Sequence, residues 1–106
     1  MISWAAGLFE GEGSIGILTN RQGLREHCYP RLQLQMADED VVLKFWEVIG
    51  RKGSICNKKP YKKGYKSLFQ WATSNRIDCE DIIELFWPYL GERRRLQAIK
   101  AGLEPE

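Results

Sequence analysis

Two segments with alternating side chains, each in a unit that begins with a helical pattern, indicate the architecture of this chain. The segments are residues 31–36 and 65–72. Side chains of a β-strand point alternately to the two faces of a sheet, so a period of two separates an apolar face from a polar one. One face carries Leu32, Leu34, Met36, Phe69 and Trp71, and the other carries Arg31, Gln33, Gln35, Lys66 and Gln70 together with the apolar Leu68. Such strands predict an antiparallel sheet with helices on one face and the other face open.

Each alternating segment forms the second strand of a hairpin that follows a helix. Gly13-Ser14-Ile15 recurs as Gly53-Ser54-Ile55 at the start of the second hairpin, which favours one unit used twice. The expected helices are residues 3–12, 39–49, Asp78 to Pro88 and 92–101, and the expected strands are residues 14–20, 31–36 after a boundary at Pro30, 53–59 and 65–72. We therefore expect an α+β fold of order αββαββα. Residues 1–106 should form a single domain, because typical domains have about 100–150 residues.

Composition excludes several other classes of protein. With 43% hydrophobic and 28% charged residues, the chain is an ordinary folded protein. Its three cysteines form no CxxC pair, so neither a disulfide framework nor a zinc ribbon is indicated, and we expect a reducing, intracellular location in cytoplasm or organelle. No apolar run reaches the roughly 20 residues of a membrane span, and residues 1–20 lack a basic leader segment. We expect a protein that is neither exported nor bound to a membrane.

Charge is distributed unevenly along the chain, although the net charge is only +2. Residues 51–76 carry 8 basic and no acidic side chains, whereas residues 1–50 and 77–106 each carry 4 basic and 7 acidic ones. Such a basic segment is either a surface that faces a polyanion or a lysine-rich hairpin in solvent. Charge alone does not separate these two interpretations.

The first helical segment contains two glycines, each of which costs a helix roughly 0.8–1.0 kcal/mol relative to alanine. Ser3, a possible N-cap, shares one stripe of this helix with Gly7 and Gly11, because the three residues are four apart, and Ala6 lies beside them. Small residues at this spacing let two helix backbones approach closely. The stripe therefore predicts tight packing against another helix.

The segment Ala5-Ala6-Gly7-Leu8-Phe9-Glu10-Gly11-Glu12-Gly13 resembles the nonapeptide that names the LAGLIDADG homing endonucleases. Ala6, Gly7, Leu8 and Gly13 agree with it, the two glutamates replace its two aspartates, and Ala5 replaces a leucine. Ser-Ile follows, as in many members. The order of elements, the basic second hairpin and a Pro-Tyr-Leu before a basic cluster extend the resemblance over nearly the whole chain.

The resemblance implies a homodimer in which the motif helices of two subunits pack together and a saddle-shaped sheet lies over double-stranded DNA. The implied interface is Ser3, Ala6, Gly7, Glu10 and Gly11, with a structural role for Glu10. Glu12 is implied as the catalytic ligand of Mg²⁺, and the Gly11 carbonyl as a second ligand. Magnesium suits this chemistry because it prefers oxygen donors and polarises a phosphate.

Two further catalytic residues follow from the resemblance. The family places a basic residue, usually lysine, near the start of its last helix, and that position falls on Arg93, with Arg94 as its nearest competitor. For any one of Arg93, Arg94 and Arg95, contact with the DNA phosphates alone is the alternative role. The family's polar residue at the start of the middle helix corresponds to Asp38, where helix capping is an equally good reason for an aspartate.

The polar strand positions are the candidate DNA contacts, because Arg and Gln side chains carry the donors and acceptors that read base edges. They are Ser14, Asn20, Arg31, Gln33, Gln35, Lys58, Lys66 and Gln70. A solvent-exposed face is the alternative. We expect a Mg²⁺-dependent endonuclease that cuts a long pseudo-palindromic site. The rival function is a non-cleaving nucleic-acid-binding protein on the same fold, either an RNA maturase or a DNA-binding regulator.

Overall fold

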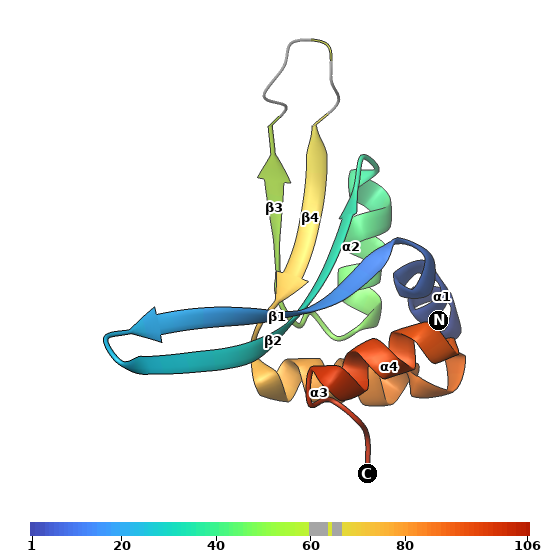
Figure 1. Ribbon diagram of the computed structural model, residues 1–106. Helices are drawn as coiled ribbons and strands as arrows, with labels where there is room; N and C mark the ends of the chain where they lie inside the picture. The colour runs from blue at the N-terminus through green and yellow to red at the C-terminus, as the bar shows by residue number, and fades with distance from the viewer. Residues whose placement is uncertain (60–63, 65–66) are drawn as a thin grey trace.

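A four-stranded antiparallel sheet and the helices on one of its faces build the protein (Figure 1). The structure is a computed structural model that describes residues 1–59, 64 and 67–106. Its elements are α1 (Ile2–Glu12), β1 (Gly13–Gln22), β2 (Arg25–Met36), α2 (Glu39–Val48), β3 (Ser54–Lys58), β4 (Leu68–Thr73), α3 (Arg76–Phe86), the 3₁₀ helix η1 (Trp87–Tyr89) and α4 (Glu92–Lys100). The strands lie in the order β1-β2-β4-β3. The expected fold class, α+β with order αββαββα, is confirmed.

The register of the sheet separates two faces as the alternation predicts. Leu34 of β2 pairs with Trp71 of β4, and both are fully buried against the helices. Phe45 of α2 meets the Trp71 ring edge-on, with 4.9 Å between centroids, and the indole nitrogen of Trp71 donates to the Lys52 carbonyl at 2.8 Å. Phe86 of α3 joins the same aromatic group through Phe45. Large side chains from two strands and two helices thus fix the sheet against the helical layer.

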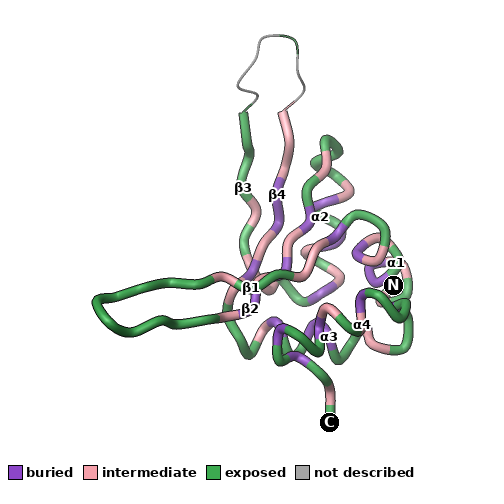
Figure 2. The backbone as a smooth tube through the Cα atoms, in the orientation of Figure 1, coloured by how far each residue is buried: buried purple, intermediate pink, exposed green. Residues whose placement is uncertain are grey.

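The β1–β2 hairpin extends well beyond the helices, and its outer half is exposed on both faces (Figures 1 and 2). β2 already begins at Arg25 and runs through Pro30, so the expected boundary at Pro30 is wrong. Proline lacks the N–H of a ladder bond and is tolerated on an edge strand. β4 pairs with β2 only from Leu32 onward, so Pro30 has a strand neighbour on the β1 side alone.

Two helix starts also differ from the expectation. α1 begins at Ile2, with Met1 in the N-cap position, so Ser3 is a helical residue and not the cap. α3 begins at Arg76, two residues before the expected Asp78. Its N-cap is Asn75, whose side-chain oxygen accepts the N–H of Asp78 at 3.1 Å. An Asn that bonds the third helical N–H is a strong start signal, and it explains the earlier beginning.

Gly13 joins α1 to β1 at a point of close approach. A Cβ at this residue would lie 2.5 Å from the Phe9 ring and 2.6 Å from the Phe9 carbonyl oxygen. Phe9 is fully buried and cannot move away without disturbing the core. The junction therefore requires glycine, and the helix passes directly into the strand.

The three cysteines are free thiols: Cys28 and Cys56 are exposed, and Cys79 is buried in α3. Burial raises the pKa of the Cys79 thiol from 9.0 to about 11. Within the described ranges, no helix is long and apolar enough to cross a bilayer.

Candidate functional site

The open face of the sheet collects most of the polar residues singled out from the sequence. The pairs Ser14–Gln33 and Asn20–His27 align β1 with β2, and Gln35–Gln70 aligns β2 with β4. Residues that pair directly across two strands share a face, as does every second residue along each strand. Seven candidates therefore lie on this one face: Ser14, Asn20, Arg31, Gln33, Gln35, Lys58 and Gln70. Lys66 lies outside the described residues. Strand parity from sequence is therefore sufficient to find the polar face.

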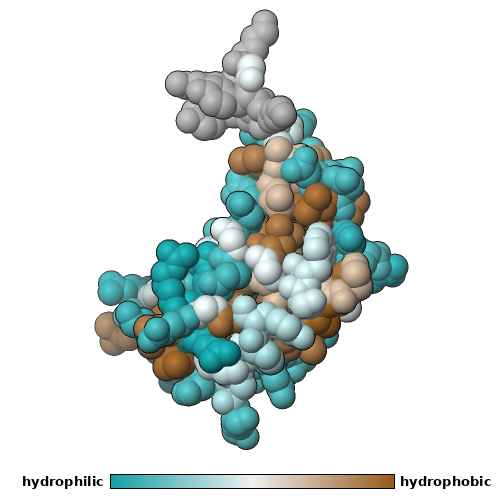
Figure 3. Space-filling model, turned by 90° about the vertical axis from the view of Figure 1, so that its right-hand side faces the viewer, coloured by the Kyte–Doolittle hydropathy of each residue, from teal (hydrophilic) through white to brown (hydrophobic). Residues whose placement is uncertain are grey.

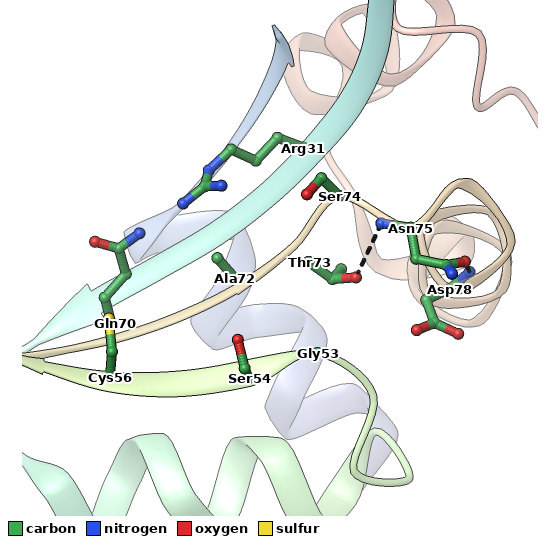
Figure 4. A pocket seen from close by; sticks show the side chains of 10 residues that line it. All are labelled: Arg31, Gly53, Ser54, Cys56, Gln70, Ala72, Thr73, Ser74, Asn75 and Asp78. Atoms are coloured by element: carbon green, nitrogen blue, oxygen red, sulfur yellow. Dashed lines mark hydrogen bonds between the residues drawn. The ribbon is translucent and has the colours of Figure 1, made fainter.

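A hollow of about 380 Å³ lies on this face, over β2, β4 and β3 and beside the start of α3 (Figure 4). Arg31 and Gln70 border it, together with Ser54 and Cys56 of β3. The last two were not among the sequence candidates, although the alternation that singled out Lys58 also places them on its face. A second hollow, of about 240 Å³, lies on the other side of Arg31, against β1.

The C-terminal end of α1 carries the two glutamates of the motif in different surroundings. Glu12 is the last helical residue and is exposed, as is Gly11. Glu10 is half-buried, and its carboxylate accepts the backbone N–H of Gly91 at 3.2 Å. A carboxylate is favourable here because Gly91 is the N-cap of α4, where the helix dipole is positive. Glu10 thus connects α1 to α4, and Glu12 stays open to solvent.

The three arginines of α4 also divide into different roles. Arg94 is only 8% exposed, and its Nε and Nη2 donate to the Glu10 carbonyl at 3.3 and 3.2 Å. Its Nη1 donates to Gln97 at 3.0 Å. Arg95 donates twice to the Trp87 carbonyl, at 3.2 and 2.8 Å. Arg93 is exposed and makes no hydrogen bond to any residue that the structure describes. Arg93 is the arginine that remains available to a ligand.

Asp38 occupies the N-cap position of α2, but its side chain makes no capping hydrogen bond. The carboxylate is exposed, so capping does not account for the aspartate at this position. Gly13 pairs with Leu34, and Asp38 follows two residues after the end of β2. Asp38 and Glu12 therefore lie at the same end of the β1–β2 ladder.

The small residues of α1 lie on two different sides of the helix. Ser3, Gly7 and Gly11 are exposed, and a Cβ at either glycine would meet no atom of the described residues within 4 Å. Ala6, in contrast, is fully buried in the core of the chain itself and has no exposed surface for a partner to contact, so its expected place in an interface is wrong. It lies about 100° around the helix from Gly7 and packs inward. Figure 3 views the molecule from the side on which α1 lies: neutral and hydrophobic surface (pale and brown) crosses the middle of this view, and hydrophilic surface (teal) lies around it.

A complete metal cage is not present within the part of the chain that the structure describes. No group of three His, Cys, Asp or Glu side chains there converges to hold a metal ion. Glu12 with the Gly11 carbonyl offers only a few hard oxygen donors per chain. Such a set suits Mg²⁺, which keeps several waters and takes further oxygens from a phosphate.

Known proteins resemble this chain in sequence and in fold, although no family model matches it. A curated relative, "Probable intron-encoded endonuclease aI3" of Dictyostelium discoideum, is 31% identical over 106 residues. The match covers 92% of this chain and 41% of the relative, so the chain spans less than half the length of that protein.

Solved structures with the same fold are homing endonucleases bound to DNA. The homing endonuclease I-CvuI in complex with a DNA target superposes with a TM-score of 0.74 at 15% identity, over 95% of this chain and 63% of that one. The group I intron-encoded homing endonuclease I-CeuI complexed with DNA gives 0.71 at 19%, over 95% and 51%. The LAGLIDADG homing endonuclease I-GzeII with its DNA target gives 0.69 at 18%, over 84% and 29%. At these identities the structures establish the fold.

Proposed function

Because the chain belongs to the LAGLIDADG homing endonuclease family, we propose that it is a site-specific endonuclease that hydrolyses phosphodiester bonds of double-stranded DNA. The observation that carries the proposal is the position of Glu12. It is exposed at the end of α1, and two residues later Ser14 already lies on the polar face of the sheet. A duplex bound on that face would have its backbone beside a carboxylate that has no ion-pair or hydrogen-bond partner among the described residues.

Magnesium is the cofactor in this proposal, with Glu12 and the Gly11 carbonyl as its protein ligands. Both groups are exposed oxygen donors, which fits a hard cation. A bound Mg²⁺ would polarise the scissile phosphate and acidify a water molecule. Arg93 would stabilise the negative charge that develops on the phosphate, since its guanidinium is free for this purpose among the described contacts. Asp38 would act at the same end of the sheet.

A homodimer completes the proposed enzyme. One subunit contributes one Glu12, and the exposed stripe of Ser3, Gly7 and Gly11 would let a second α1 approach closely. Two carboxylates would then meet at a twofold axis, where cations offset their repulsion. A twofold-symmetric enzyme would cut a long pseudo-palindromic site, because its two sheets would read the two half-sites alike.

Cleavage of a duplex library with a randomised central segment tests the activity. We expect cut products with Mg²⁺ and none with EDTA, and Glu12→Gln should lower the cleavage rate about 100-fold or more without abolishing binding. Glu10→Gln is the matched control, because its amide oxygen can still accept the Gly91 N–H and cleavage should persist. Binding without any cleavage by the wild type would replace the nuclease with the non-cleaving alternative.

The dimer is tested by adding bulk at Gly7. In one subunit Gly7→Leu has open space and gains helix propensity of about 0.8 kcal/mol, so the subunit should fold at least as well as before. In the proposed dimer the leucine would hold the two helices apart. We expect sedimentation to show a dimer for the wild type and a monomer for the variant. A wild type that is monomeric on DNA would refute the homodimer.

A further inference from the structure

Three side chains on the polar face of the sheet form a connected group, which we call the Arg31 triad: Arg31, Gln33 and Gln70. The Nε of Arg31 donates to Oε1 of Gln33 at 3.2 Å, and Nε2 of Gln70 donates to the same oxygen at 3.5 Å. Arg31 and Gln33 are two residues apart on β2, and Gln70 reaches them from β4. The close-up shows Arg31 and Gln70 above the same surface of the sheet (Figure 4).

The chemistry of arginine fixes the direction of every hydrogen bond in this group. A guanidinium has donors only, so the atom of Gln33 that meets Arg31 must be its oxygen. Since that oxygen then accepts from both sides, the atom that Gln70 offers it must be its amide nitrogen. Both lone pairs of the Gln33 oxygen are therefore used, and the orientations of both amides are set.

The group leaves a defined set of atoms for a ligand. The two terminal nitrogens of Arg31, Nη1 and Nη2, donate to no acceptor within the described portion of the chain. Arg31 borders both hollows of the polar face, about 380 and 240 Å³, so these nitrogens lie beside open space. Gln70 is only 5% exposed and is held in place by its surroundings. The two terminal nitrogens of Arg31 are thus two parallel donors at the centre of the polar face, and the hydrogen bond from Nε to Gln33 holds the guanidinium on its other side.

We propose that Arg31 selects guanine at one base pair of each half-site and that Gln33 is the positioning residue that orients it. This inference rests on the proposed function as a DNA-binding nuclease. Guanine is the base with two adjacent acceptors, O6 and N7, in the major groove, and a two-pronged arginine matches them. Gln33, predicted from its parity to read a base, instead uses its acceptor to hold the arginine. Its amide oxygen is not available to DNA.

Four variants separate these roles. Arg31→Lys keeps the charge but loses the fork, so the preference for guanine at one position should fall about 10-fold or more while affinity for random duplex changes little. Gln33→Leu removes the tether and should weaken the same preference by about 3- to 10-fold. Gln33→Glu keeps an acceptor and should preserve it. Arg25→Lys, at the outer end of the same strand and on the same face, should leave that position unchanged.

The experiment selects bound duplexes from a pool with a randomised segment, in EDTA, and sequences them for each protein. Thermal unfolding accompanies it, because the triad lies on the open face and none of the four variants should unfold more than a few degrees earlier. The inference is supported if the preference for guanine at one position weakens in Arg31→Lys and in Gln33→Leu but in neither of the other two variants. A wild-type site whose guanines are all unaffected by Arg31→Lys overturns it and leaves the nuclease proposal intact. No selection of any duplex by the wild type would overturn both.

Discussion

The neighbouring arginines Arg93 and Arg94 should respond in opposite ways to the same substitution. Arg94 is nearly buried and donates three hydrogen bonds, two of them to the carbonyl of Glu10 near the C-terminal end of α1. Helix-end carbonyls lack partners within their own helix, so Arg94 satisfies a group that nothing else in its helix serves. Arg93 projects from the same turn of α4 and is exposed. The pair offers a comparison matched in residue type and sequence position.

The expected magnitude follows from these contacts. Hydrogen bonds to charged groups contribute about 1.5–3 kcal/mol, and removing Arg94 leaves the Glu10 carbonyl partly buried without its donor. Arg94→Ala should therefore lower the free energy of unfolding by about 2 kcal/mol, which for a domain of this size lowers Tm by roughly 8–16 °C. Arg93→Ala should change it by less than about 0.5 kcal/mol, as for most surface substitutions. Arg94→Lys should be intermediate, because one ammonium cannot reproduce the fork.

Tryptophan fluorescence during urea and thermal unfolding measures stability, at one fixed protein concentration because association would shift Tm. DNA cleavage at a temperature where all variants are folded supplies the second readout. In the proposed enzyme Arg93→Ala loses cleavage and keeps stability. The reasoning is refuted if Arg94→Ala proves as stable as Arg93→Ala, since the hydrogen bonds to Glu10 would then contribute nothing measurable.

Three further comparisons test other parts of the fold. Gly13→Ala should lower the free energy of unfolding by about 1–3 kcal/mol through steric overlap with α1. Gly16→Ala, with no described atom within 4 Å of its Cβ, should change it by less than about 0.5 kcal/mol. Urea titration compares the two variants. Asn75→Ala should cost about 1 kcal/mol as a lost cap, while Asp38→Ala, without a capping bond, should spare stability but lower cleavage. Because the folded pKa of Cys79 is raised from 9.0 to about 11, its thiol favours the folded state below pH 9, and this contribution should fall by up to about 1.4 kcal/mol per pH unit between pH 9 and 11. When unfolding is measured at several pH values, the free energy of unfolding of Cys79→Ala should decline less steeply between pH 9 and 11 than that of the wild type.

The sequence predicted the fold well because the relevant signal is local. Alternation in residues 31–36 and 65–72 assigned each side chain to a face, and the observed register agrees over the part of these segments that the structure pairs, residues 32–36 and 68–72. Pro30 was misjudged because its tolerance depends on where β4 begins to pair with β2, which is a property of the assembled sheet. Ala6 was misjudged for a similar reason. Small residues at helical spacing permit close packing against any partner, and only the tertiary structure shows that Ala6 faces its own core.

The roles of the arginines were beyond reach of sequence reasoning for a different reason. Arg94 and Glu10 are 84 residues apart, and three successive arginines have equal chemistry until the fold places a backbone carbonyl beside Arg94 and another beside Arg95. The same holds for Gln33, whose parity was predicted correctly but whose oxygen is occupied by two neighbours. Residue types along a strand predict the face on which each side chain lies, whereas only the tertiary contacts show whether a polar atom is free to bind a ligand.

The contacts on either side of Glu12 explain how a helix end can hold the proposed metal ligand in a fixed position. Helix termini normally fray, because their last carbonyls lack partners. Here Glu10, two residues before Glu12, is tied to α4 through both its carboxylate and its carbonyl. Gly13, one residue after, is packed on Phe9 and begins a strand paired with Leu34. Gly11 and Glu12 are thus the exposed residues between two anchored ones, so the backbone of Glu12 is restrained while its carboxylate has no partner among the residues that the structure describes. Since one anchor depends on Arg94, loss of that arginine should loosen the backbone at Glu12, the proposed metal ligand, as well as the fold.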